Sequence, residues 1–79
     1  MTLKHNGFWI SGSALPGPPY TTDWEALAIV LKPGRGGSVV EAARLHVGDF
    51  ALETKELAES FGLEIARIIV DECLNAQDI

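Results

Sequence analysis

Apolar positions alternate with small or polar positions along the first part of the chain, which is the period of a β-strand. Within residues 4–14 one set of alternate positions is apolar or small, and it comprises Phe8, Ile10, Gly12 and Ala14. The positions between them, Trp9, Ser11 and Ser13, take the other face. The pattern therefore predicts a first strand over residues 4–14 with a tryptophan on its second face.

A second strand is predicted over residues 24–32, where both alternating sets of positions are apolar. An apolar run of this length indicates a strand that is covered on both sides. The segment between the two strands, LPGPPYTTD, holds three prolines. Proline cannot donate to a strand ladder, so we expect this segment to be a loop.

A third strand is expected within residues 38–52, and its clearest alternation sets Ala43, Leu45 and Val47 against Arg44, His46 and Gly48. The start of the segment has a second interpretation. Ser38 and Glu41 have the spacing of a capping box, which would make SVVEAARLH a short helix. We favour the strand, because a short glycine loop between two strands is a normal hairpin connection.

That loop, KPGRGGS at residues 32–38, fits neither of the two common phosphate-binding patterns. A P-loop requires a lysine directly after its last glycine, and Ser38 stands there. The dinucleotide pattern requires a third glycine at the position of Val39. Glycine accepts a positive φ without steric cost, so the loop predicts a hairpin turn with Arg35 exposed at its tip.

The strongest helical pattern covers residues 55–75, with Thr54 as the N-cap and Glu56 in the first turn. On a helical wheel its apolar residues span about 220°. A helix that packs one face on a sheet needs an apolar stripe of little more than about 100°. We therefore expect a second surface to cover part of this helix.

Three small residues on this helix, Ala58, Gly62 and Ala66, recur every four positions and form one ridge. Glycine lowers helix propensity by about 1 kcal/mol relative to alanine, so a close backbone contact at Gly62 would explain its presence. Packing within the chain is one interpretation of the ridge. The other, which we adopt as a prediction, is a homodimer interface formed by the ridge and Ile69.

These elements predict a single α+β domain over residues 1–79, in which a three-stranded antiparallel meander packs against one long C-terminal helix. One helix covers only one face of such a sheet. The face that is left open would carry Trp9 and aliphatic side chains, and large exposed apolar patches usually mark an interface. The alternative is that loops of the same chain fold over this face. We therefore predict a homodimer that uses either the helix or the open face of the sheet.

Charge and cysteine content narrow the range of partners and locations. The formal net charge is −5, and only six lysines and arginines are scattered along the chain, which makes nucleic acid and anionic lipid unlikely partners. Cys73 is the single cysteine, so an intramolecular disulfide is excluded. The N-terminal residues do not form a signal peptide, and the sequence has no apolar run of membrane-spanning length. We expect a cytoplasmic protein.

No catalytic, metal-binding or cofactor-binding pattern is found in the sequence. The two histidines and the one cysteine lack the spacing of a zinc site, and no serine lies in a nucleophile elbow. We expect no catalytic residue, no metal and no cofactor. The candidate binding residues are therefore aromatic or positively charged side chains, or an imidazole: Trp9, Tyr20, Trp24, Arg35 and His46.

The function predicted from these observations is a non-enzymatic, homodimeric module that binds another protein or a small apolar ligand. The alternative is a small enzyme whose site forms between subunits, with His46 or Asp49 as the acid or base. A concave pocket at His46, Asp49 or Tyr20 would favour the enzyme, whereas a flat surface would favour the interaction module.

Three stretches carry a resemblance to known proteins: GFWISGSA at 7–14, WEALAIVL at 24–31 and DFALETKELAESFGLEIARIIVDECL at 49–74. The chain resembles small uncharacterised bacterial proteins in which an aromatic-rich strand pair precedes a Phe-x-x-x-Glu/Lys-Glu-x-Ala segment and a helix with Ala-Arg-x-x-Ile-Asp. The positions that approximate this pattern are Phe50, Glu56, Ala58, Ala66, Arg67 and Asp71. The resemblance implies a β-β-β-α organisation and no known activity.

Overall fold

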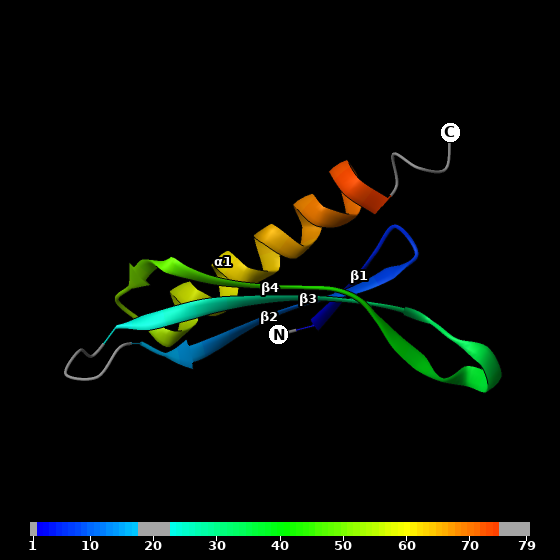
Figure 1. The fold of residues 1–79 in the computed structure, drawn as a ribbon, viewed down its shortest axis with the longest axis horizontal. Helices are drawn as coiled ribbons and strands as arrows, with labels where there is room; N and C mark the ends of the chain where they lie inside the picture. The colour runs from blue at the N-terminus through cyan, green and yellow to red at the C-terminus, as the bar shows by residue number, and fades with distance from the viewer. Residues whose placement is uncertain (1, 18–22, 75–79) are drawn as a thin grey trace.

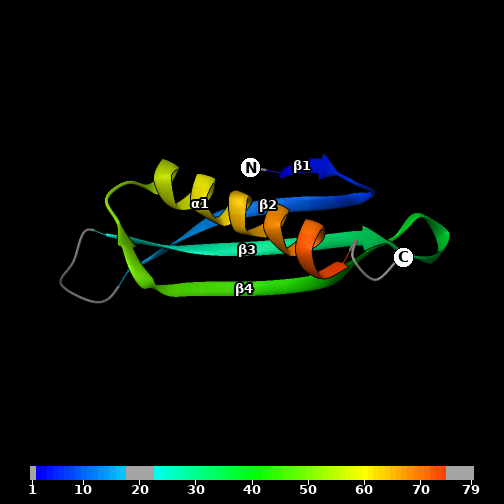
Figure 2. The ribbon, with the colours of Figure 1, turned by 90° about the horizontal axis from the view of Figure 1, so that it is seen from above.

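The computed structural model describes residues 2–17 and 23–74, with the backbone alone for residues 49–51. Within these residues an antiparallel sheet of four strands is crossed on one face by the C-terminal helix (Figures 1 and 2). The elements are β1 (Thr2–His5), β2 (Phe8–Pro16), β3 (Trp24–Pro33), η1 (Arg35–Gly37), β4 (Val39–Leu52), α1 (Lys55–Ile68) and η2 (Ile69–Leu74). The strand order in the sheet is the order along the chain, so the predicted meander and α+β class are confirmed.

The prediction of three strands is wrong, because the segment predicted as one strand over residues 4–14 forms the end of β1, a turn and most of β2. His5 pairs with Phe8, which leaves Asn6 and Gly7 as a two-residue turn. Their φ angles are 49° and 87°, and two positive φ angles identify a type I′ hairpin. Asn-Gly is the dipeptide that this turn favours most, so the sequence carried the signal for the additional strand.

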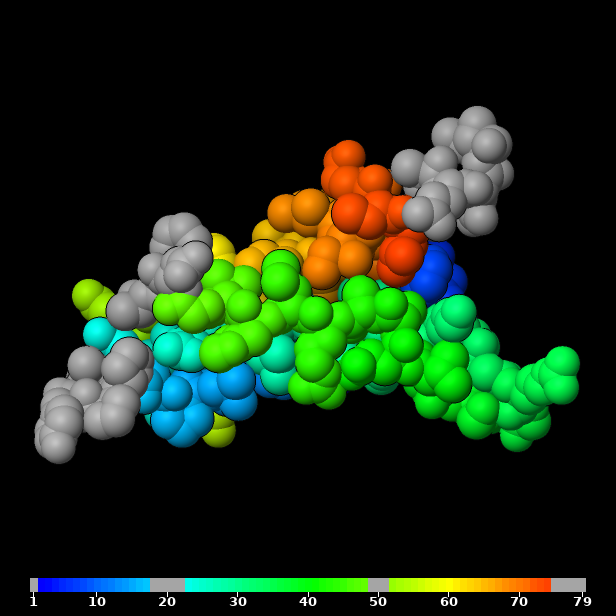
Figure 3. All heavy atoms as spheres, in the orientation of Figure 1, coloured from blue at the N-terminus to red at the C-terminus, as the bar shows by residue number. Residues whose placement is uncertain are grey.

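The glycine loop is a hairpin turn between β3 and β4, as predicted. Gly36 and Gly37 have φ angles of 67° and 80°, which residues with a Cβ rarely adopt. The Ser38 hydroxyl donates a hydrogen bond of 2.7 Å to the Arg35 carbonyl, so it closes the turn and does not cap a helix. β4 then begins at Val39, which confirms the strand interpretation. This hairpin projects beyond the body of the protein (Figures 1 and 3).

The C-terminal helix begins where the sequence predicted. The Thr54 hydroxyl accepts a hydrogen bond of 3.1 Å from the backbone N–H of Leu57, which is the expected N-cap. After Ile68 the helix continues as the π-helical segment η2 to Leu74, and the predicted last residue, Asn75, lies outside the described residues. Among the helices that the structure describes, none has the length and apolar character that crossing a bilayer requires.

The backbone of α1 lies directly on the backbone of the sheet at two glycines. A Cβ atom added to Gly62 would lie 2.5 Å from the carbonyl oxygen of Leu27 in β3. A Cβ atom added to Gly12 of β2 would overlap the backbone of α1 at Glu59 and Leu63. Gly62 and Gly12 also face each other, because the Cβ atom added to Gly62 would lie 3.2 Å from the Cα atom of Gly12. Only residues without a side chain fit on both sides of this contact.

The hydrophobic core extends from the glycine contact toward the C-terminal end of the helix. It is formed by five buried residues of β2, β3 and the helix: Ile10, Ala28, Val30, Ala66 and Val70. An α-helix turns by about 40° over four residues, so a four-residue ridge rotates away from the sheet. The wider turns of η2 reduce this rotation. Val70, four residues after Ala66, is therefore still fully buried.

The Gly62 contact predicts that adding a single methyl group destabilises the protein. In an exposed helix Gly62→Ala would stabilise by about 1 kcal/mol. Here the new Cβ would meet the Leu27 carbonyl, so we expect a net loss of about 1–3 kcal/mol in the free energy of unfolding. Denaturant titration of the purified parent and G62A proteins measures this change in the free energy of unfolding.

The matched control is Gly48→Ala, because a Cβ on Gly48 would lie 3.6 Å from the Glu25 carboxylate, an ordinary van der Waals distance. We expect this variant to unfold within about 0.5 kcal/mol of the parent. A G62A protein that is at least as stable as the parent would contradict the close contact.

Candidate functional site

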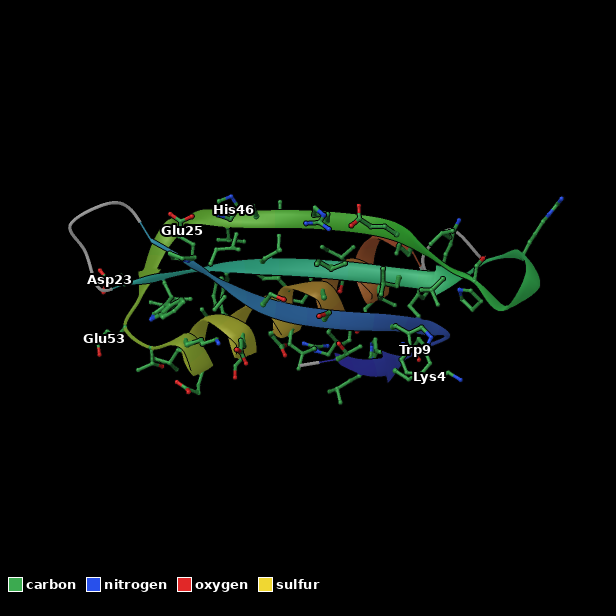
Figure 4. The ribbon with its side chains drawn as sticks, turned by 90° about the horizontal axis from the view of Figure 1, so that it is seen from below. Lys4, Trp9, Asp23, Glu25, His46 and Glu53 are labelled. Atoms are coloured by element: carbon green, nitrogen blue, oxygen red, sulfur yellow. The ribbon has the colours of Figure 1, made fainter. Side chains whose placement is uncertain are left out.

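The candidate binding residues are spread over the molecule. Trp9 lies on the face of the sheet opposite α1, the open face, where it is 38% exposed, and the Lys4 ammonium lies 5.7 Å from the centre of its ring (Figure 4). Trp24 is half-buried at the other end of the sheet. Arg35 is exposed in the β3–β4 turn. Tyr20 lies outside the described residues.

His46 is the only one of these residues that pairs with a carboxylate among the described side chains. Its Nε2 lies 2.5 Å from Oε1 of Glu25, and the two side chains meet on the open face across β4 and β3 (Figure 4). The Glu25 side chain is 17% exposed and that of His46 is 51% exposed. The Asp49 side chain, the other predicted acid or base, is not among those described. In the described part of the chain no pocket is found, and no three metal-ligating side chains gather.

The predicted homodimer ridge lies against the protein's own sheet. Ala58 and Ala66 have no exposed surface, and Gly62 between them is buried in the contact with Leu27 and Gly12. Ile69 is half-buried against the same core. The close backbone contact expected at Gly62 is therefore present, but it is made within the chain. In this arrangement the three ridge residues have no free surface for a second copy.

A polar network that sequence reasoning missed joins the β1–β2 turn to η2. Nε2 of His5 lies 2.8 Å from Oδ1 of Asp71, and the Asn6 amide donates a bond of 3.0 Å to the same oxygen. Arg67 donates a bond of 3.1 Å to Oδ2. The hydrogen bond with His5 is the main reason that the pKa of Asp71 is lowered from its ordinary value of 3.8. His5 and Asp71 are 66 positions apart, so no local pattern could have paired them.

The free edge of the sheet is the most extensive open feature of the fold. β4 forms one edge and is 14 residues long, whereas β1 at the other edge has four residues. Residues 43–47 pair regularly with residues 26–30 of β3, and the register shifts on both sides of this stretch. Such irregularities bend a strand and interrupt its pairing. The longest regular stretch of the free edge is therefore residues 43–47, with Leu45 at its centre, and a shorter one covers residues 39–41.

Helix α1 leaves this edge uncovered, because it lies over β2 and β3 (Figure 2). In Figure 3 the outer side of β4 faces the viewer along the length of the sheet. Leu45 pairs with the buried Ala28, so it is on the helix side of the sheet, yet it is 46% exposed. An edge strand carries backbone groups that are available to another strand.

An apolar strip runs beside this edge. The side of the helix that carries Arg67 and Asp71 faces β1, because Asp71 contacts His5. At 100° per residue, Ile65 is about 160° from Arg67 and therefore faces β4. We define the apolar strip as Leu45 on β4 together with the apolar residues that the same helical geometry places on this flank of α1, which are Phe61, Ile65 and Ile68. Ile68 is 45% exposed, so part of the wide apolar arc predicted from the sequence remains uncovered.

Comparisons with protein-family models, with curated proteins and with solved structures found no match for the chain. The resemblance to small bacterial proteins and the cytoplasmic location therefore stay predictions.

The His5–Asp71 network predicts a loss of stability in acid. A carboxyl group whose pKa is lowered by folding stabilises the folded state above its ordinary pKa of 3.8, and this contribution disappears as the pH falls below that value. We expect Asp71→Asn to be less stable than the parent at pH 7, with a difference that shrinks as the pH falls below about 4. Urea unfolding between pH 2.5 and 7 measures this difference.

Glu72→Gln is the control for the loss of one carboxylate charge, because Glu72 is the exposed neighbour of Asp71. If the free energies of unfolding of D71N and the parent differ by the same amount at pH 7 and at pH 2.5, the charge of Asp71 does not stabilise the fold.

Proposed function

We propose that the protein is a non-enzymatic interaction module that binds another polypeptide at the free edge of β4. The observation that carries this proposal is the regular edge at residues 43–47, flanked by the apolar strip. An extended polypeptide that adds to such an edge gains main-chain hydrogen bonds, and its alternate side chains add specificity. On the helix side of β4 these side chains would cover Leu45.

The small size of the buried core supports a need for additional contacts. Among the described residues the largest side chains with essentially no exposed surface are Val30 and Val70. Large apolar side chains such as Leu45, Leu57 and Ile68 remain about half exposed. Small domains bury a smaller share of their surface than large ones, so their stability depends more strongly on every further apolar contact. A partner at β4 would supply such contacts.

A strand edge favours a polypeptide over a small apolar ligand. Small ligands bind in concave sites that surround most of their surface. The β4 edge instead offers a linear row of backbone groups with polar side chains on one face and apolar side chains on the other, as Arg44 and Leu45 illustrate. This arrangement matches an extended chain with alternating side chains.

The second candidate function, a small enzyme with a site between subunits, is favoured by the His46–Glu25 pair. A carboxylate that holds an imidazole in place is a common arrangement for a general base. His46 follows Leu45 directly, so a partner at the edge would lie next to it. A turnover reaction that is lost in His46→Ala while partner binding persists would establish this candidate in place of the first.

The interaction proposal predicts that a crosslinker at Leu45 captures a polypeptide. Leu45 would be replaced by p-benzoylphenylalanine in the full chain, produced in its native cells and irradiated. The matched control is the same replacement at Leu3, an equally exposed leucine on β1 at the opposite edge, since the two residues are 46% and 51% exposed.

We expect a discrete adduct from position 45 and none from position 3, with mass spectrometry identifying the crosslinked peptide. The absence of any adduct at position 45, or the same adducts from both positions, would count against the proposal.

A further inference from the structure

We infer that the polypeptide bound at the β4 edge is a second copy of this chain, added antiparallel to form a continuous eight-stranded sheet with a twofold axis at Leu45. This inference rests on the proposed function, because it names the partner of the same edge. It differs from the dimer predicted from the sequence, which used either the helix with its ridge of small residues or the open face of the sheet.

The regular stretch of the β4 edge is symmetric about Leu45. Residues 43–47 are bounded by a register shift on each side, and Leu45 is their centre. In a twofold antiparallel pair centred on Leu45, all five residues face residues of the same regular stretch. In a pair centred one residue away, on Arg44 or on His46, only three of the five residues would face residues of this stretch.

On the helix side of the sheet, the opposed side chains of the two copies are all apolar. In the Leu45-centred pair, Leu45 faces Leu45 of the second copy, and Ala43 faces Val47 of the second copy. All of these side chains are apolar, and opposed apolar pairs stabilise neighbouring strands. A twofold axis normal to the sheet keeps both helices on the same face. Phe61, Ile65 and Ile68 of each copy would then flank the new apolar row, over the part of β4 that α1 leaves uncovered (Figure 2).

On the open face, the basic side chains at the junction are each paired with a carboxylate of their own chain. Here Arg44 faces His46 of the second copy. In each chain Oε1 of Glu25 lies 2.5 Å from His46, and Oε1 of Glu41 lies 2.8 Å from Nη2 of Arg44. Each basic side chain at the junction therefore brings its own carboxylate. Glu25 lies outward of His46 on β3, and Glu41 lies beside Arg44 along β4 itself, so Arg44 meets a His–Glu pair and not an isolated cation.

The test measures the oligomeric state of the purified full chain by sedimentation equilibrium. We expect a dimer, and we expect Leu45→Lys to raise its Kd by about 100-fold or more, because two lysines would face each other at the centre of the interface. The matched control is Leu3→Lys on β1, which leaves the Kd unchanged. Circular dichroism checks that both variants are folded.

A second measurement does not depend on a destabilising variant. In a Cys73→Ser background, which removes the exposed native thiol, Leu45→Cys places two cysteines directly opposite each other. Opposed residues have Cβ atoms about 4.5–5.5 Å apart, close to the separation in a disulfide. We expect L45C to form a disulfide dimer. A43C and V47C should crosslink when mixed, and neither should crosslink alone.

The outcomes separate this inference from the proposed function. A monomer at all concentrations, without disulfide formation in L45C, overturns the second copy as the partner. If the crosslinker at position 45 then captures a different protein in cells, the interaction module stands. If it captures nothing, both proposals fail. A dimer that L3K disrupts and L45K does not would place the interface at β1, and a disulfide in A43C alone would overturn the register.

Discussion

The contact between Gly12 and Gly62 determines where the other elements can lie. Because neither glycine has room for a Cβ atom, the backbone of α1 rests directly on β2 and β3. A helix held at this point covers the middle of the sheet and cannot also cover β4 (Figure 2). The uncovered edge is therefore a consequence of the glycine contact. The same contact turns one flank of the helix toward β1, where Asp71 meets His5, and the other flank, with Ile65, toward β4.

Close packing through small residues has an energetic consequence. Alanine and glycine bring two backbones together, but they remove little apolar surface from water, and burial contributes about 25 cal/mol per Å². Among the described residues the largest side chains with essentially no exposed surface are accordingly those of Val30 and Val70, and Ile10 beside them is 3% exposed. The larger apolar residues, such as Leu45 and Ile68, lie at its margin. Association through that margin would add burial that the single chain lacks, so folding and binding would be thermodynamically linked.

Local patterns predicted most of the elements but not their arrangement. The Thr54 cap, the glycine turn and the alternation at residues 43–47 are local signals, and the structure confirms each of them. The Asn6-Gly7 dipeptide is an equally local signal for a hairpin turn. The aromatic residues that follow it favour a strand, so the pattern alone predicts one continuous strand across this turn. The spacing of Ala58, Gly62 and Ala66 predicted a close contact without identifying its partner, because spacing does not specify which backbone approaches. The edge position of β4 and its pairing irregularities depend on strand order, which a single sequence does not encode locally.

The irregularities in the pairing of β4 affect whether further copies of the chain could extend the sheet. A long regular edge strand invites continued strand addition and aggregation. Here the register shifts divide the edge, and its longest regular stretch is residues 43–47, which one antiparallel copy would occupy completely. The outer edges of the resulting sheet would both be β1, a strand of four residues that carries Lys4 and His5. Short edges with basic side chains are a known means of preventing further pairing. In the proposed dimer the open edge is therefore closed by pairing, and the edges that remain are the ones least suited to extend the sheet.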